Sequence, residues 1–144
     1  MNVLFICEGN INRSQMAEIF FRSLFPYAHV LSAGTCVPPE YEGKLVSSIS
    51  EKAIKVMLNI GMDMSRSRMK QLTRKMVDAS DQVILITPNL GHIPDYLATS
   101  PKLEVWDVGD PGYGQITHTE ARDITKAKVE QFARDLIART NWSR

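Results

Sequence analysis

Residues 2–14 of this chain read NVLFICEGNINRS, a short apolar run that passes directly into a loop with a cysteine, a glycine and an arginine. The run from Asn2 to Ile6 is typical of a strand that is buried on both faces. Apolar residues recur at helical spacing from Ser14 until Pro26, so we expect the loop to join a strand to a helix.

This loop has the residues of an oxyanion cradle. Backbone N–H groups of a tight loop and of a helix N-terminus point at a bound anion. Arg13 adds a permanent positive charge and a planar guanidinium that can donate hydrogen bonds to two oxygens of the bound anion. The same positive field favours the thiolate of Cys7, which is the nucleophilic form. A buried structural cysteine is the alternative interpretation, but open sheets bind ligands beyond the carboxyl ends of their strands, which favours the cradle.

The composition is typical of a soluble globular protein. The length predicts one domain, residues 1–144, with a core that needs no disulfides or metals. The net charge of +1 gives no argument for binding nucleic acid or a membrane. The two cysteines, Cys7 and Cys36, are too few for a disulfide framework or a Cys-rich zinc site. We expect no metal or cofactor, because the histidines lack metal-ligand spacing: His29, His92 and His118.

The sequence also bears on location. No apolar stretch reaches the roughly 18 residues of a membrane-spanning helix, and no charged leader or cleavage site precedes the first strand. We therefore expect a cytoplasmic monomer without nucleic-acid or membrane partners, in a reducing environment that keeps Cys7 a free thiol.

Strand-like and helix-like segments alternate along the chain. Short apolar runs predict strands over residues 2–6, 29–34, 82–87 and 103–107. Helical spacing and capping boxes at Ser48/Glu51 and Thr117/Glu120 predict helices over residues 14–25, 48–58, 66–75 and 89–97 and from Thr117 onward. The alternation predicts an α/β fold, with a parallel sheet covered by helices on both faces.

The motifs along the chain resemble those of a known family. CEGNINRS at residues 7–14, followed by QMAE, is similar to the signature of low-molecular-weight protein tyrosine phosphatases. The similarity continues in order at Ser32–Thr35, Gly61–Asp63, Ser65–Leu72, Ala79–Asp81 and Asp110–Pro111. The resemblance implies a three-layer α/β/α fold with a four-stranded parallel sheet, and a phosphate-binding loop between the first strand and the first helix. It also implies a cofactor-free phosphatase acting on a phosphotyrosyl protein or a small aryl phosphate.

The resemblance assigns roles to individual residues. Cys7 would be the nucleophile of a phosphoryl transfer through a phosphocysteine, and Asp110 would protonate the leaving oxygen and then deprotonate water. Asn10 would brace the loop against Ser32, and Ser14 would stabilise the thiolate. The phosphoryl oxygens would be held by the loop, which comprises Glu8, Gly9, Asn10, Ile11, Asn12, Arg13 and Ser14.

Two acids compete for the proton-transfer role. Asp107 and Asp110 both lie in the loop WDVGDPGYG, residues 106–114, where an Asp before Pro or Gly is also common turn chemistry. The family places its acid immediately before a proline, so Asp110 is favoured.

Two positions depart from the family pattern. Many relatives carry a second cysteine directly before the loop arginine, where this chain has Asn12. We therefore expect peroxide to inactivate the protein without forming a Cys7–Cys36 bond. Glu8 puts a negative charge at the mouth of an anion site, which disfavours phosphate unless the side chain faces outward or pairs with a cation.

The predicted pocket walls favour an aromatic leaving group. Ile11 resembles the tyrosine-directed branch of the family, whereas a threonine at this position resembles the arginine phosphatase branch. Ile11 and Tyr113 would form walls suited to a flat ring. Gly112 replaces an aromatic residue of many relatives, which widens the expected pocket. Phosphotyrosine is the favoured substrate.

Three other functions stay open. An arsenate reductase would use the same loop for an arsenic oxyanion, but its thiol relay needs cysteines late in the chain and none follows Cys36. A sugar-transport phosphocarrier would not need Arg13 and Asp110, since a carrier does not activate hydrolysis. A catalytically degenerate oxyanion-binding or regulatory module is favoured only by Glu8 and Asn12.

Overall fold

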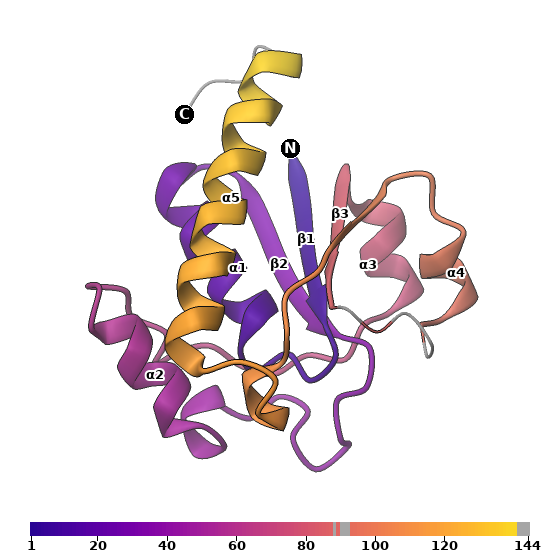
Figure 1. The fold of residues 1–144 in the computed structure, drawn as a ribbon. Helices are drawn as coiled ribbons and strands as arrows, with labels where there is room; N and C mark the ends of the chain where they lie inside the picture. Colours follow the sequence, from indigo (N-terminus) through magenta and orange to yellow (C-terminus); the bar gives the residue numbers. More distant parts are fainter. Residues whose placement is uncertain (88, 90–92, 141–144) are drawn as a thin grey trace.

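One parallel sheet organises the fold. The computed structural model, which describes residues 1–87, 89 and 93–140, contains β1 (Asn2–Cys7), β2 (His29–Gly34), β3 (Gln82–Ile86) and β4 (Leu103–Trp106). The strands are ordered β2-β1-β3-β4 and are all parallel, which confirms the predicted four-stranded sheet. Figure 1 shows β1 between β2 and β3. The central strands β1 and β3 are almost entirely buried, which explains their continuous apolar runs.

Helices cover both faces of this sheet. α1 (Arg13–Leu24) and the long α5 (His118–Thr140) pack side by side on one face, and α2 (Glu51–Leu58) contacts α5 (Figure 1). The other face carries two short helices, α3 (Arg74–Ala79) and α4 (Asp95–Ala98). The predicted three-layer α/β/α arrangement is therefore confirmed.

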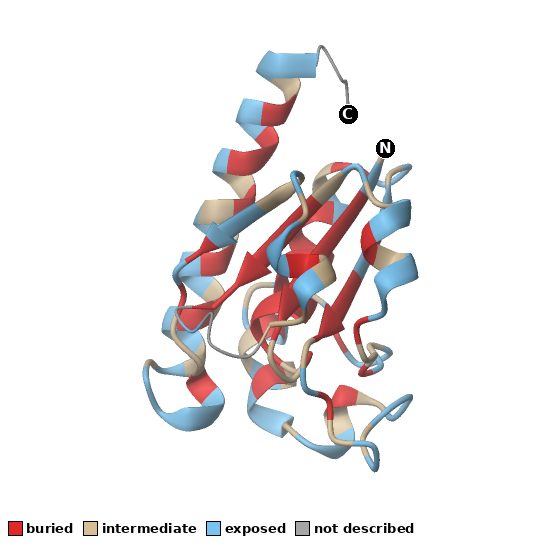
Figure 2. Cartoon of the chain, turned by 90° about the vertical axis from the view of Figure 1, so that its right-hand side faces the viewer, coloured by how far each residue is buried: buried red, intermediate tan, exposed pale blue. Residues whose placement is uncertain are grey.

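Alternation of side chains along β1 builds a core on each face. Val3 and Phe5 belong to the cluster shared with α1 and α5, whereas Leu4 and Ile6 belong to the cluster shared with α3 and α4. Figure 2 shows the buried strands between these layers. Phe5 contacts three further rings at centroid distances of 5.8, 5.9 and 6.3 Å: those of Phe21, Trp106 and Phe132. This packing holds the strand from which the loop departs.

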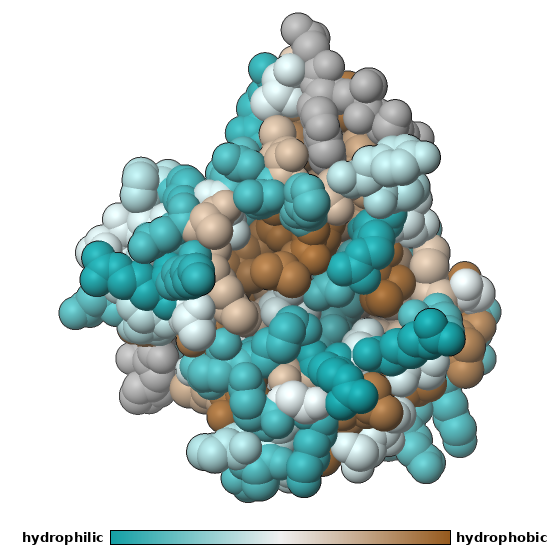
Figure 3. Space-filling model, turned by 180° about the vertical axis from the view of Figure 1, so that it is seen from behind, coloured by the Kyte–Doolittle hydropathy of each residue, from teal (hydrophilic) through white to brown (hydrophobic). Residues whose placement is uncertain are grey.

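The layer of α3 and α4 covers less of the sheet than the layer of α1 and α5. Leu31, on the edge strand β2, pairs with Leu4 on the face of α3 and α4 and is 49% exposed. Seen from behind, hydrophobic side chains gather near the middle of the molecule, bordered by hydrophilic ones (Figure 3).

The topology places the predicted phosphate loop at a crevice. The chain leaves β1 through α1 to reach β2 on one side, and it later crosses to β3 on the other side. Ligands of open α/β sheets bind where the connections diverge in this way. Cys7 ends β1 and Arg13 begins α1, so the loop between them lies at this point.

The helix predicted over residues 66–75 is wrong. Arg68 forms an isolated bridge with Leu45, and Gln71 forms one with Gly34. The N–H of Gly34 donates to the carbonyl of Lys70 at 2.8 Å, which pairs this segment with the last residue of β2. Tertiary pairing thus overrides the weak helical pattern, and α3 begins only at residue 74.

The two capping predictions have different outcomes. Ser50, not Ser48, caps α2, because its hydroxyl accepts a hydrogen bond from the N–H of Ala53 at 3.2 Å. Ser48 lies in the preceding 3₁₀ turn. The second box is confirmed: Thr117 and Glu120 each accept from the other's N–H at 3.0 Å.

Part of the predicted segment 89–97 lies outside the described residues, and its helix begins at Asp95. Among the residues that the structure describes, no helix combines the length and the apolar character needed to cross a bilayer. In that same part of the chain, which contains His29 and His118 but not His92, no cluster of His, Cys, Asp and Glu has the makings of a metal site.

Candidate active site

The loop between Cys7 and Arg13 presents backbone donors. Within the described part of the chain, the N–H groups of residues 9–12 donate to no carbonyl. α1 starts at Arg13 without a side-chain cap, so its first N–H groups also lack that common acceptor. An oxyanion seated in the loop would supply acceptors to these donors.

Asn10 stabilises the conformation of the loop from its buried side. It is fully buried and has a φ of +56°, a conformation that Asn tolerates better than most residues. Its Nδ2 donates to Ser14 Oγ at 2.8 Å and to Ser32 Oγ at 3.0 Å. Its Oδ1 accepts from Gln15 Nε2 and from the Lys70 N–H, both at 2.9 Å. Four hydrogen bonds to its side chain, from three segments, therefore fix this loop residue.

Ser14 connects this network to the sulfur of Cys7. Ser14 Oγ lies 2.9 Å from Cys7 Sγ, and both residues are buried. Because Asn10 Nδ2 already donates to Ser14 Oγ, the hydroxyl hydrogen is left to point at the sulfur. Ser14 is thereby oriented as a hydrogen-bond donor to a thiolate.

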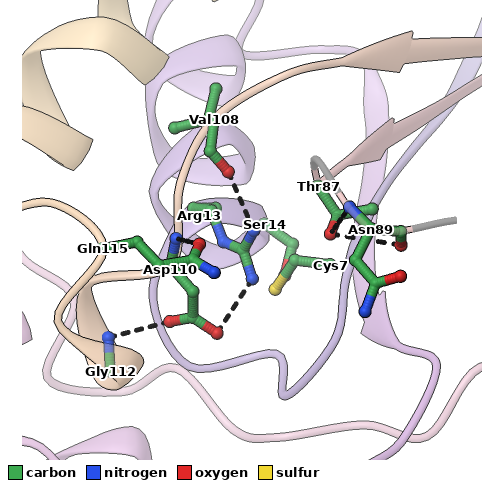
Figure 4. Close-up of polar contacts among 9 residues, drawn as sticks. All are labelled: Cys7, Arg13, Ser14, Thr87, Asn89, Val108, Asp110, Gly112 and Gln115. Carbon is green, nitrogen blue, oxygen red and sulfur yellow. Dashed lines mark hydrogen bonds and ion pairs between the residues drawn. The ribbon is translucent and has the colours of Figure 1, made fainter.

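Arg13 is held by the loop that follows β4. Its side chain is 2% exposed, with Nη1 donating to the carbonyl of Val108 at 2.9 Å and Nη2 contacting Asp110 Oδ2 at 3.1 Å (Figure 4). Its Nε has no partner among the described residues. A buried donor without an acceptor costs free energy, and an oxyanion bound beside Arg13 would relieve that cost.

Asp110 is positioned by a turn that was absent from the predicted elements. Pro111–Tyr113 form a 3₁₀ turn, and Asp110 caps it because its Oδ1 accepts from the N–H of Gly112 at 2.8 Å (Figure 4). Its own N–H donates to Gln115 Oε1 at 2.7 Å. One carboxylate oxygen is thus fixed by the turn, and the other faces Arg13.

A pocket of about 410 Å³ opens above the loop. Its wall contains most of the predicted site residues, namely Cys7, Glu8, Gly9, Ile11, Asn12, Arg13, Asp110 and Tyr113. Asn10, Ser14 and Ser32 do not line it and instead lie buried beneath the loop. Asp107 is exposed and does not line it either.

Three further wall residues, Cys36, Pro38 and Tyr41, were missed by the sequence analysis. They follow β2, whose carboxyl end lies beside that of β1 because Cys7 pairs with Gly34 in the parallel sheet. The end of β2 was therefore the signal that could have found them. We still predict that oxidation forms no disulfide between Cys7 and Cys36.

Gly34 lets β2 approach the loop closely. A Cβ at this position would lie 2.6 Å from the carbonyl oxygen of Glu8 and 3.0 Å from the N atom of Asn10. Both are backbone atoms, which cannot swing aside as a side chain can. Only glycine fits here without moving the loop.

Two titratable groups near the site have shifted pKa values. Burial, and then the charge of Lys52, lower the pKa of His118, and the charge of Asp110 opposes them. Burial also lowers the pKa of Lys70, whose backbone N–H holds Asn10. His118 is therefore mainly neutral near pH 7 and adds little positive charge near Asp110.

Comparisons with known proteins agree with this geometry. Residues 2–141 match the family model described as low molecular weight phosphotyrosine protein phosphatase. The chain is 33% identical over 141 residues to a probable low molecular weight protein-tyrosine-phosphatase, EpsP, of Ralstonia nicotianae, covering 90% of this chain and 92% of that protein. A similar phosphatase of Acinetobacter johnsonii matches over a shorter stretch, 58% of its own length.

Other relatives extend the range of named activities. Arsenate reductase 1 of Staphylococcus epidermidis is 32% identical over 133 residues, covering 91% of this chain and 94% of that protein. The crystal structure of a low molecular weight protein tyrosine phosphatase from T. tengcongensis superposes with a TM-score of 0.76 at 26% identity, covering 94% of this chain and 99% of that one. With the family model spanning nearly its whole length, the chain belongs to the low molecular weight phosphotyrosine protein phosphatase family.

Proposed function

We propose that this protein hydrolyses phosphotyrosine in proteins, with Cys7 as the nucleophile and Asp110 as the general acid and base. The observation that carries the proposal is the convergence of Cys7, Arg13 and Asp110 on one pocket, above a loop whose N–H groups have no described acceptor. Phosphoryl transfer needs positioning and charge stabilisation more than any other contribution from the protein, and these groups supply both.

In the first step, the Cys7 thiolate attacks phosphorus, so that an S–P bond forms while the P–O bond to the leaving group breaks. The loop N–H groups and Arg13 hold the equatorial oxygens. A phosphoryl group that engages Arg13 draws its Nη2 away from Asp110 Oδ2, while Asp110 Oδ1 remains held by Gly112. Oδ2 is then the oxygen that delivers a proton to the leaving phenolate.

In the second step, water attacks the phosphocysteine. The carboxylate of Asp110 takes a proton from the water as the new P–O bond forms and the S–P bond breaks. The Cys7 thiolate is regenerated, with Ser14 Oγ at 2.9 Å to stabilise it, and inorganic phosphate leaves. No redox step or additional reactant is required.

The pocket wall supports an aromatic substrate. Ile11, Tyr41 and Tyr113 contribute apolar and aromatic surface beside the loop. A flat phenol ring can stack or pack edge-on against such surfaces. Tyr113 is 72% exposed, so it borders the pocket from the solvent side.

The arsenate reductase relatives raise a second activity, which the cysteine content opposes. A thiol relay passes a disulfide between several cysteines, and this chain contains only Cys7 and Cys36.

We also propose a cytoplasmic location, because a reducing compartment would keep Cys7 a free thiol.

Steady-state hydrolysis in the presence of EDTA tests the proposed function. We expect turnover of para-nitrophenyl phosphate and of a phosphotyrosyl peptide, and far slower turnover of the matched phosphoseryl peptide. Rapid acid quenching followed by peptide mapping should find the phosphoryl group on Cys7. Arsenate consumption coupled to thiol oxidation, without phosphatase turnover, would instead support the reductase.

The two candidate acids can be separated with matched variants. Asp110→Asn should lower kcat for phenyl phosphate by about a hundredfold and flatten its pH profile between pH 4 and 8, because a positioned proton donor is lost. The loss should be smaller for para-nitrophenyl phosphate, whose leaving group needs less protonation. Asp107→Asn, the control, changes an exposed residue outside the pocket and should have little effect. An equal or greater loss from Asp107→Asn would overturn the assignment.

Gly34→Ala tests the close approach of β2 to the loop. The added methyl group would displace the backbone at Glu8 or Asn10, so kcat/KM for para-nitrophenyl phosphate should fall by at least about tenfold. The free energy of unfolding should fall by about 1–3 kcal/mol, as is typical of overpacking. Urea unfolding and steady-state kinetics measure the two effects. A variant with wild-type kcat/KM would show that the loop tolerates this displacement.

A further inference from the structure

The carboxylate of Glu8 is without a hydrogen-bond or ion-pair partner in the described part of the pocket wall. Glu8 follows the nucleophile directly, is partly buried and lines the pocket. Among the described residues, its carboxylate takes part in no hydrogen bond or ion pair. Its backbone carbonyl accepts a hydrogen bond from the Cys36 N–H at 2.9 Å. This bond holds the backbone of Glu8 against the segment that follows β2.

Among the described residues that line the pocket, the charges do not balance that of Glu8. The described wall of the pocket carries one guanidinium, Arg13, and two carboxylates, Glu8 and Asp110. Arg13 already contacts Asp110 at 3.1 Å. Glu8 also borders a small adjoining cavity, whose other described lining residues are all uncharged: Thr35, Cys36, Leu85, Thr87, Asn89 and Ile93.

The carboxylate of Glu8 affects which substrates bind favourably in the pocket. A phosphoryl dianion in the loop brings further negative charge close to Glu8, and like charges in a partly desolvated pocket repel. A substrate that carries its own cation beside the phosphorylated residue would offset the repulsion. A substrate with a neutral or acidic neighbour would not, so Glu8 would discriminate by both attraction and repulsion.

We propose that Glu8 selects phosphotyrosyl substrates in which a positively charged side chain, arginine or lysine, flanks the phosphotyrosine. The inference rests on the proposed phosphatase function and specifies its substrate class. Glu8 acts here as a specificity residue that pairs with the substrate outside the phosphoryl group, and the chemistry at Cys7 is unchanged.

Three phosphotyrosyl peptides that differ only in the residue next to the phosphotyrosine, Arg, Gln or Glu, test this inference. The wild type should show kcat/KM in the order Arg, Gln, Glu, with about fivefold between neighbours, the size of a favourable exposed ion pair. The preference should shrink as the salt concentration rises. Glu8→Gln should bring the Arg-to-Glu ratio close to one, and because a ratio is compared, any general change in activity cancels.

Glu40→Gln is the matched control. It removes the same charge from the same loop as the wall residues Pro38 and Tyr41, but Glu40 is exposed and does not line the pocket. It should keep the wild-type ratio. Equal kcat/KM for the three peptides, or a ratio that Glu8→Gln leaves unchanged, would overturn the inference while leaving the phosphatase intact. Failure of the wild type to hydrolyse any of the peptides would overturn the proposed function itself, and this inference with it.

Discussion

Replacing Cys7 by serine should abolish turnover, with kcat for para-nitrophenyl phosphate falling by on the order of 10⁵-fold or more. A serine hydroxyl stays protonated near neutral pH and is a poor nucleophile without a base beside it. Among the described residues, the side chain hydrogen-bonded to Cys7 Sγ is Ser14, whose hydroxyl is not a base. The loss should therefore be in the chemical step.

The fold of this variant should persist, because an oxygen is smaller than the sulfur that it replaces at a buried position. Thermal unfolding and the affinity for inorganic phosphate check that the loop is intact. Cys36→Ser is the matched control, since Cys36 is the other free cysteine and is exposed. Cys36 borders the pocket but lies outside the phosphate-binding loop, so this variant should keep the nucleophile and most of the wild-type kcat. Substantial turnover by Cys7→Ser would remove Cys7 from the nucleophile's role.

Arg13→Lys should lower kcat by roughly 10³–10⁵-fold although the charge is kept, the size of effect that an arginine has on phosphoryl transfer. The guanidinium reaches Val108 O and Asp110 Oδ2 through two different nitrogens, and its Nε remains for a third acceptor. An ammonium is a single compact donor centre and cannot span these positions. The variant thus loses the paired donors for the phosphoryl oxygens and the contact that joins Arg13 to the Asp110 carboxylate.

Kinetics with para-nitrophenyl phosphate, together with phosphate affinity, measure this loss. Arg68→Lys is the matched control, because Arg68 also donates to a carbonyl, that of Gly43, but lies outside the pocket wall. It should keep most of the wild-type kcat. If Arg13→Lys retained more than about a tenth of the wild-type kcat, positive charge alone would suffice, and the fork geometry would be unnecessary.

The sequence determined the parts of the protein that depend on local pattern. The apolar runs of β1 and β3 predict buried strands because both faces of a covered sheet exclude water. Cys7 and Arg13 occur in one contiguous loop, and the reciprocal contacts of Thr117 and Glu120 span a single turn. Local patterns fail where a distant partner competes, as at residues 66–73, whose backbone pairs with Gly34 and Leu45 in place of forming a helix.

Which distant groups meet at the loop depends on the three-dimensional arrangement of the chain. Arg13 and Asp110 are separated by 97 positions in the sequence, yet they form an ion pair because the chain returns from β4 across the end of β1. The hydrogen bond from the Lys70 N–H to Asn10 also joins segments that are distant in the sequence. The same is true of the part of the pocket wall that Cys36 and Tyr41 form beside the loop. The sequence alone shows that Glu8 puts a negative charge beside an anion-binding loop. That its carboxylate lacks a partner among the described residues is a property of the folded pocket. Periodicity and capping depend on neighbours within a few residues, whereas a binding pocket depends on contacts that exist only once the sheet has brought remote segments together.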